Sequence, residues 1–214
     1  MLVLPLNEET TLYKSAPHSR TRRRRIAGFS MVELAVSMTV LLILTAIAIP
    51  SLMHSMRAYQ LNDTAARLSD MLKLTRFEAV RRNRQINFLM QPSGTGWLVG
   101  TDSNLDGNID TTDKQLLIKG FVTLLAGGTP TPTAITAALN VNSLTPTPAN
   151  PGPLQFDARG AVRVNGTLTA SVYVFYVGAA ANPGEFGYRA VILLPSGATQ
   201  IWTAAAGGTW RRSG

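Results

Sequence analysis

The sequence has no cysteine and only two histidines, His18 and His54. Disulfides, thiolate metal sites and a cysteine nucleophile are therefore excluded, and little material is left for a Ser-His-Asp triad or a His-rich metal site. Charged residues are also scarce, at 15%, whereas 45% of the residues are hydrophobic, which is enough for a packed core. No P-loop, dinucleotide fingerprint or nucleophile motif is visible, so the sequence does not predict an enzyme.

Positive charge is present in excess, but it is unevenly distributed. The formal net charge is +8, which would suit a nucleic-acid partner. However, residues 1–28 hold six of the twenty basic residues and only two of the twelve acidic ones. The rest of the chain is therefore only mildly basic.

A long apolar run follows this basic segment. The 24 residues from Phe29 to Leu52 are almost wholly apolar, and four arginines, Arg22–Arg25, come just before them. As a helix, this run would cross the roughly 30 Å of a bilayer's hydrocarbon core. The positive-inside rule places its N-terminus in the cytoplasm and the following residues on the other side. Pro50 should kink the helix, because it removes one backbone hydrogen bond.

The helix is expected to continue past the membrane. Residues 29–53 form the expected transmembrane segment, and residues 54–85 the expected soluble half. An apolar stripe at alternating spacings of four and three predicts that this second half packs on a globular domain. Its members are Leu61, Ala65, Leu68, Leu72, Thr75 and Ala79.

From residue 86 onward the pattern changes to short apolar segments separated by Gly, Asn and Pro, which predicts antiparallel strands. We expect residues 86–214 to form a β domain with two sheets, giving an α+β fold. A Thr/Pro-rich stretch at 126–153 predicts an extended loop. The expected strands are 86–90, 96–100, 115–119, 161–164, 170–177, 188–194 and 199–203.

The residues at the start of the apolar run, Gly28-Phe29-Ser30-Met31-Val32-Glu33-Leu34, resemble the signal of type IV pilins and type II secretion pseudopilins. This resemblance implies a leader at 1–28. A membrane aspartyl prepilin peptidase would cut between Gly28 and Phe29 and then methylate the new N-terminal Phe29. Glu33 would be the acidic fifth residue of the mature chain, and Pro50 the proline that follows the first apolar stretch in this family.

Further along, four segments are similar to minor pseudopilins of the GspH/FimT type. They are Leu74–Asn83, Gly96-Trp97, the acidic loop Asp102–Asp113 and Phe156-Asp157-Ala158-Arg159-Gly160. The resemblance implies a single-pass protein of the bacterial inner membrane with a periplasmic C-terminal domain. Its partners would be other pilins or pseudopilins and the assembly platform of a type II secretion system or a type IV pilus. Neither residues 1–28 nor the stretch at 126–153 matches the usual family pattern.

Glu33 has a physical reason to matter. An ionised carboxylate near the membrane is costly and requires a partner. The free amine of Phe29 on a neighbouring subunit is one candidate, since like helices stack with an axial stagger in a pilus. The alternative is a glutamate that only lies near the lipid headgroups.

An acidic loop follows the spacing of a calcium site. Oxygen side chains fall at positions 1, 3, 5, 9 and 12, with Gly107 at position 6. A solvated hairpin turn would use the same residues. The expected ligands are Asp102, Asn104, Asp106, Asp110 and Asp113, with the carbonyl of Asn108.

DNA binding is the competing function, because some FimT-like proteins are DNA receptors that use arginines around a C-terminal turn. The matching turn here, Gly197–Gln200, has no arginine. Arg211 and Arg212, beside Trp210, could replace it with two charges and an aromatic face. A second basic cluster, at Arg76, Arg81, Arg82 and Arg84, is either a solvated helix end or a phosphate-binding patch. Asp157 and Arg159 predict a salt-bridged turn.

Overall fold

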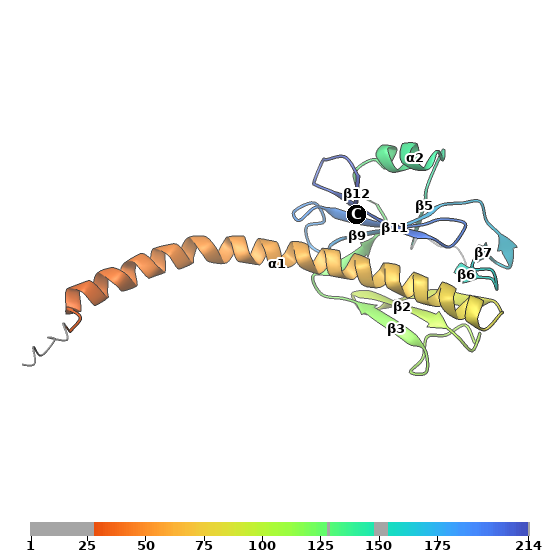
Figure 1. Cartoon of the computed structure of the whole chain (residues 1–214), viewed down its shortest axis with the longest axis horizontal. Helices are drawn as coiled ribbons and strands as arrows, with labels where there is room; N and C mark the ends of the chain where they lie inside the picture. Colours follow the sequence, from red (N-terminus) through yellow and green to blue (C-terminus); the bar gives the residue numbers. More distant parts are fainter. Residues whose placement is uncertain (1–27, 128, 148–153, 214) are drawn as a thin grey trace, which may run out of the picture. The chain divides into compact units, whose positions relative to one another are not determined.

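The computed structural model describes residues 28–127, 129–147 and 154–213, and the expected leader lies outside them except for Gly28. The chain divides into two compact units between Thr45 and Ala46. The long helix α1 (Met31–Arg81) begins in the first unit and continues into the second. All strands belong to the second unit (Figure 1).

The second half of α1 is amphipathic, as its sequence predicts. The buried residues of the helix are the six of the expected stripe together with Ser69. The helix ends where Asn83 adopts a left-handed conformation, with φ 49°. The amides of Asn83 and Arg84 then bond back to the carbonyls of Val80 and Ala79, at 3.1 Å each. This pattern caps the last carbonyls of the helix and turns the chain into the first strand.

The first sheet has six strands in the order β3-β2-β1-β6-β7-β8. All of its neighbouring strands are antiparallel. Strand β3 and strand β8 are its edges. The bounds are β1 Ile86–Ser93, β2 Gly96–Asp102, β3 Lys114–Ile118, β6 Leu154–Phe156, β7 Val162–Val164 and β8 Thr167–Leu168.

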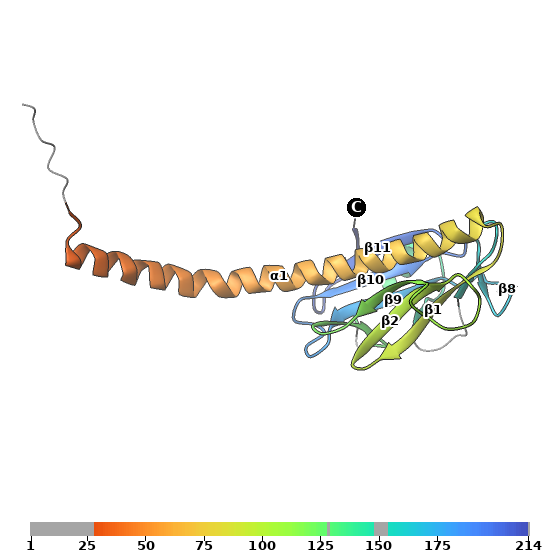
Figure 2. The same cartoon turned by 90° about the horizontal axis from the view of Figure 1, so that it is seen from below.

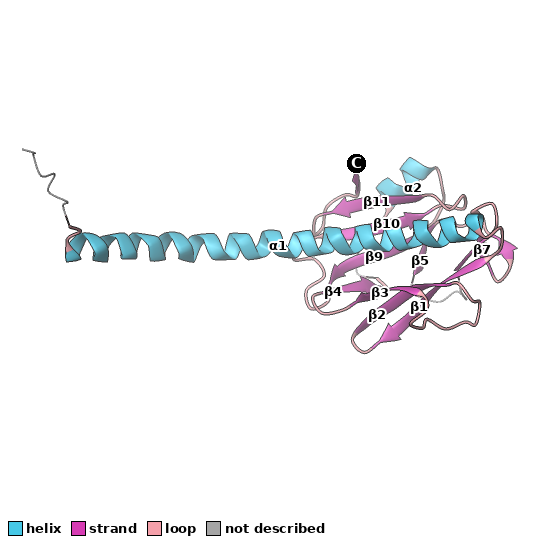
Figure 3. Ribbon diagram, turned by 60° about the horizontal axis from the view of Figure 1, so that its bottom comes forward, coloured by secondary structure: helices cyan, strands magenta, loops and turns pink. Residues whose placement is uncertain are grey.

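The second sheet follows the order β12-β11-β10-β9-β4, and β5 pairs with β9 in parallel. Strands β9 and β10 are buried along their whole lengths, so both faces of the sheet are covered at its centre. Figures 2 and 3 show α1 running across these strands. The bounds are β4 Val122–Leu125, β5 Thr145–Thr147, β9 Tyr173–Ala179, β10 Tyr188–Leu193, β11 Thr199–Ala204 and β12 Arg211–Ser213.

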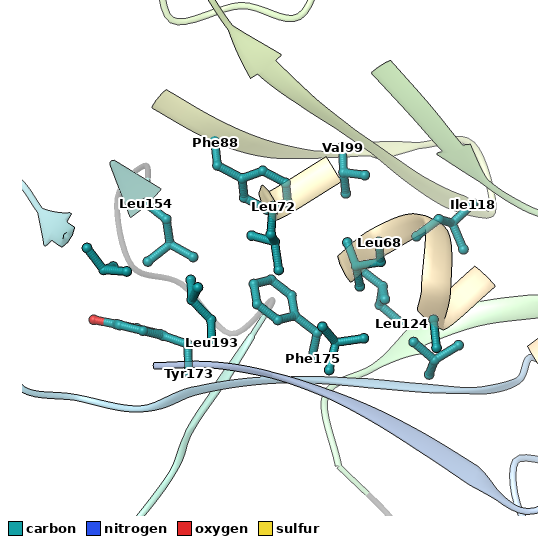
Figure 4. Close-up of a cluster of buried hydrophobic side chains, with 14 of the residues drawn as sticks. Leu68, Leu72, Phe88, Val99, Ile118, Leu124, Leu154, Tyr173, Phe175 and Leu193 are labelled. Carbon is teal, nitrogen blue, oxygen red and sulfur yellow. The ribbon is translucent and has the colours of Figure 1, made fainter. Parts of the chain in front are cut away.

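The main core lies where the helix meets the two sheets. Leu68 and Leu72 of α1, both fully buried, point among side chains from each sheet, including Phe88 and Phe175 (Figure 4). The rings of Phe88 and Phe175 meet edge to face, with 6.0 Å between their centroids. Because each sheet contributes one of the two rings, the helix and both sheets are held in one apolar cluster.

A second core covers the other face of the second sheet. It contains Ile135 from the short helix α2 (Thr133–Leu139), Tyr176 from β9 and Trp210. The expectation of an extended loop at 126–153 is therefore wrong for α2 and for β5. These residues are ordered because Ile135 is fully buried and the Thr147 hydroxyl donates to the Val174 carbonyl at 3.0 Å. Residues 128 and 148–153 of the stretch lie outside the described residues.

The predicted α+β architecture is confirmed: a long N-terminal helix packs on antiparallel strands that form two sheets. Besides β5, strands β4, β6, β8 and β12 were not predicted. Each is two to four residues long, which is too short for an alternating pattern to stand out.

Candidate membrane and assembly site

The first half of α1 exposes nearly all of its large apolar side chains. It is the one helix in the described part of the chain that is long and apolar enough to cross a membrane, and no residue of its most apolar window is buried. Among the large apolar side chains of this half, the exposed fraction is highest at Met31, at 89%, and lowest at Val40, at 50%. A bare apolar surface of this length requires a lipid or protein environment.

Three hydroxyl groups of this half are satisfied within the helix. The hydroxyls of Ser37, Thr39 and Thr45 donate to carbonyls four residues earlier, at 2.7, 2.9 and 2.7 Å. In hydrocarbon every polar group must find an internal partner. The three hydroxyls therefore do not oppose insertion into a bilayer.

The expected processing residues lie at the start of this half. Phe29 is 74% exposed, and a side chain added at Gly28 would meet nothing within 4 Å. Glu33 lies in the first turn of α1, where a negative charge complements the helix dipole. An open backbone before the first turn is what a peptidase needs to reach, but cleavage and methylation stay predictions.

Pro50 lies inside α1, and the helix continues through it without interruption. Its missing amide leaves the carbonyl of Ala46 without the usual helical partner. The predicted kink is not tested by this continuity and stays a prediction.

The acidic loop is built on hydrogen bonds to its own backbone. Asp102 is fully buried; one of its carboxylate oxygens accepts from the Leu105 amide at 2.6 Å and the other from the Gly107 amide at 3.1 Å. Asp113 accepts from the amide and hydroxyl of Ser103, each at 3.1 Å. In the described residues, no three His, Cys, Asp or Glu side chains converge as a metal site would require.

The two other carboxylates of the loop are exposed or half-buried. Asp106 accepts from the Asn108 amide at 2.8 Å and from the Asn104 side chain at 2.8 Å. The hydroxyl and amide of Thr112 lower the pKa of Asp110. The loop thus holds ionised oxygens, but calcium would have to replace these internal bonds, and its binding stays a prediction.

The basic cluster at the end of α1 is engaged within the domain. Glu78 pairs with Arg81 at 2.7 Å and with Arg82 at 2.9 Å, and the hydrogen bond from Arg81 is the largest cause of its lowered pKa. The Arg84 guanidinium donates to the carbonyl of Ser103. The Arg76 Nε donates to the carbonyl of Gly160 at 3.2 Å. This arrangement favours a structural helix end over a phosphate-binding patch.

The expected salt-bridged turn at Asp157 forms with a different arginine. The Asp157 carboxylate accepts from the amides of Arg159 and Ala161 at 2.9 Å each, and from the Arg163 guanidinium at 3.3 Å. Only the backbone of Arg159 takes part. Sequence proximity suggested Arg159, but the hairpin between β6 and β7 brings Arg163 back beside the carboxylate.

One of the three expected DNA-binding residues cannot act as proposed. Trp210 is only 2% exposed, its ring lies 5.7 Å from that of Tyr176, and its Nε1 donates to the carbonyl of Pro130 at 3.1 Å. It fills the second core and offers no face for base stacking. Arg211 and Arg212 are exposed on the edge strand β12.

A cluster that no sequence pattern predicted lies where α1 enters the β domain. His54 lies on Phe186 with 4.9 Å between ring centroids, Phe186 contacts Phe121 at 5.1 Å, and the Arg57 guanidinium lies 4.4 Å from the Phe121 ring. Nearby, Arg189 is nine-tenths buried in the otherwise apolar run of β10. A single arginine within an apolar strand was the sequence feature that could have pointed to this cluster.

Comparison with known protein families adds two matches. The family described as type II transport protein GspH matches residues 64–197, which is more than half of the chain. The prokaryotic N-terminal methylation motif matches residues 23–49. No curated protein and no solved structure matches the chain.

Proposed function

Because the chain belongs to the GspH family of type II transport proteins, we propose that it is a minor pseudopilin or pilin, a structural subunit of a secretion or pilus filament. The match to GspH over residues 64–197 carries this proposal. It covers the second half of α1 and the strands from β1 to β10. The match to the methylation motif at 23–49 supports a membrane anchor and a processing signal in this subunit.

In this proposal the apolar half of α1 holds the chain in the bacterial inner membrane before assembly, with the β domain on the periplasmic side. Afterwards the same surface packs against neighbouring subunits. The exposed apolar side chains support both steps, since lipid tails and apolar helices are equivalent environments for them. Other pseudopilins, the prepilin peptidase and the assembly platform are the proposed partners.

The test is removal of the gene followed by complementation with the unaltered chain. Loss of exoprotein secretion would assign the filament to type II secretion, and loss of surface pili would assign it to a type IV pilus. Restoration by the unaltered chain, but not by a Glu33→Ala variant, is expected. Normal secretion and normal piliation without the gene would contradict a structural role in either filament.

A DNA-binding role in transformation is the alternative, and the exposure of Arg211 and Arg212 favours it. Filter binding of the detergent-solubilised chain separates the two. Affinity for DNA that falls with salt and is lost in an Arg211→Gln/Arg212→Gln variant would support the alternative. An Arg159→Gln variant is the matched control, because it removes an exposed arginine elsewhere.

A further inference from the structure

The guanidinium of Arg189 is a buried cation without a carboxylate partner in the described residues. Its Nε donates to Asn62 Oδ1 at 2.5 Å, and one terminal nitrogen donates to the Tyr188 carbonyl at 2.9 Å. No described residue accepts from the other terminal nitrogen, and the residue is only 9% exposed. Burial lowers the pKa of Arg189. An arginine nevertheless stays charged, and a largely buried charge without an ionic partner is costly.

This guanidinium borders a hollow open to solvent. The hollow is also lined by His54 and Asn62 of α1, by Glu185 and Phe186 of the loop before β10, and by Ser213 of β12. The carboxylate of Glu185 is directed elsewhere, accepting from the Asn182 side chain at 3.1 Å. In the described residues no Arg189 nitrogen is both buried and unpaired, so its free N–H groups reach the solvent of the hollow, where they can donate to an anion that enters it.

The position of the hollow along α1 indicates which kind of anion binds there. His54 comes two residues after Leu52, where the apolar run ends. At 1.5 Å per residue, His54 lies about 3 Å and Arg57 about 7 Å beyond that end along the helix axis. The headgroup layer of a bilayer occupies roughly the first 5–7 Å beyond the hydrocarbon core. This part of α1 therefore lies at the depth of the lipid phosphates.

The side chains around this level are those that favour a headgroup layer. Phe186 and Phe121 contact each other and link His54 to Arg57, which lies over the Phe121 ring. Lys119 lies in the adjacent groove with Arg57. Basic side chains gather at membrane interfaces because they combine an apolar stem with a charged end, and the phenylalanine rings beside them add apolar surface.

We propose that the hollow at Arg189 binds the phosphodiester of an anionic phospholipid headgroup, with His54 and Ser213 at its edge and Arg57 beside it. The proposal rests on the membrane anchoring proposed above. The lipid phosphate completes the hydrogen bonds of Arg189 and fixes the β domain at the membrane surface before assembly. Glu185, the acidic side chain in the lining, opposes the anion.

The test uses the full-length chain reconstituted in vesicles that contain equal amounts of phosphatidylglycerol and phosphatidylcholine. The chain is extracted in mild detergent, and its retained lipid is identified by native mass spectrometry. Preferential retention of phosphatidylglycerol is expected. Arg189→Gln should lower this preference roughly tenfold or more, since it removes a charge-assisted bond. Arg159→Gln should leave it unchanged.

A second variant keeps the proposal testable if Arg189→Gln fails to fold. Glu185→Gln removes the opposing charge at an exposed position and should raise retention. Equal retention of the two lipids by the unaltered chain, or a fall in retention with Glu185→Gln, would overturn the proposal. Inorganic phosphate or an oligonucleotide that binds through Arg189, while phosphatidylglycerol does not, would overturn the lipid assignment.

Membrane fractionation separates this failure from failure of the proposed function. A chain that sediments with the membrane and supports secretion or piliation, but shows no lipid preference, would refute only the lipid site. A chain absent from the membrane fraction would refute the anchoring on which both proposals depend.

Discussion

At the scale of single residues, the contact between Gly197 and Gly160 joins two turns beneath the end of α1. Both glycines have φ of 78°, in the left-handed region. A Cβ at Gly197 would overlap the carbonyl oxygen of Gly160 and lie 2.8 Å from the Cδ of Arg76. That carbonyl also accepts the hydrogen bond from Arg76. Glycine is therefore required at position 197 by space as well as by conformation.

We predict that Gly197→Ala destabilises the protein more than Gly166→Ala does. Gly166 has φ of 77°, but a Cβ there would meet nothing within 4 Å. Both variants bear the left-handed strain of about 1 kcal/mol. Only Gly197→Ala adds a backbone overlap, at a further cost of about 1–3 kcal/mol. Thermal unfolding of both variants measures the difference, and equal melting temperatures would contradict the packing described here.

Asp157 provides a prediction for how the stability of the fold depends on pH. Burial opposes ionisation of its carboxyl, but the amides of Ala161 and Arg159 and the Arg163 guanidinium outweigh it and lower the pKa. A lowered pKa stabilises the folded state above the unfolded value of about 3.9, and this stability is lost as pH falls through the folded pKa. Asp157→Asn should therefore cost about 1–3 kcal/mol at neutral pH.

The difference in unfolding free energy between Asp157→Asn and the unaltered chain should shrink below about pH 4. Asp70→Asn is the control, because Asp70 makes an exposed pair with Lys73 and should matter little at any pH. Denaturant unfolding across this pH range is the measurement. A constant difference down to the lowest pH would show that the ionised carboxylate is not the stabilising group.

At the scale of elements, predictability follows from length and regularity. The stripe from Leu61 to Ala79 predicted its buried face, because each member recurs at helical spacing over five turns. Strand β4 and helix α2 lack such a pattern: Val122–Leu125 has only four residues, with Thr123 among the apolar ones, and Ile135 is the sole buried residue of α2. Their order comes from tertiary contacts with β9 and its neighbours, which no local pattern encodes.

The residues of the candidate site also differ in whether a local sequence pattern identifies them. Gly28, Phe29 and Glu33 belong to one local motif in front of an apolar run, so a sequence pattern can propose their roles, which stay predictions. The Arg189 hollow combines residues from α1, the loop before β10 and the end of β12. Trp210 was misassigned because the sequence cannot show that the segment around Pro130 covers it.

The loop at 102–113 carries the prediction of a calcium effect. The exposed Asp106 and the half-buried Asp110 can exchange their internal hydrogen bonds for an ion, and an affinity typical of extracellular modules is about 10⁻⁴–10⁻³ M. Millimolar calcium should then stabilise the fold by roughly 1 kcal/mol and raise the melting temperature by about 2–4 °C. Thermal melts of the full chain in calcium and in EDTA test this, with magnesium as the control. Identical melts would show that the loop is a hydrogen-bonded turn without a metal.

At the scale of the whole molecule, one continuous helix serves two environments. Its first half exposes apolar side chains and contains its own hydroxyl bonds, whereas its second half supplies one wall of the main core. The methylation-motif match, at residues 23–49, covers most of the first half, and the GspH match, at residues 64–197, covers most of the second half and continues through β10. The two matches do not overlap. Anchoring and assembly can therefore be altered in the first half without touching the residues that fold the β domain.

The last prediction separates processing from assembly on this basis. A large residue at Gly28, such as Gly28→Leu, should block cleavage, because the peptidase must approach the backbone closely between Gly28 and Phe29. Gly28→Ala is the milder comparison and should be cut in part. Neither change should affect folding, since a Cβ at position 28 would meet nothing within 4 Å.

Glu33→Ala should act at a later step. Insertion should survive or improve, because a charge is removed from the apolar half. Docking beside neighbouring subunits should fail, because the amine of Phe29 would lose its carboxylate partner, and an unpaired buried charge costs about 3–5 kcal/mol. Glu33→Gln is the matched control: it keeps the size of the side chain but lacks the charge, so it should fail as well if the ion pair is the cause.

N-terminal sequencing of the membrane-extracted protein distinguishes the steps, since Gly28→Leu should leave an uncut precursor and Glu33→Ala a cut subunit that is absent from filaments. A mature N-terminus at Met1 or beyond Pro50 in the unaltered chain would contradict both the cleavage site and the anchoring role of the helix.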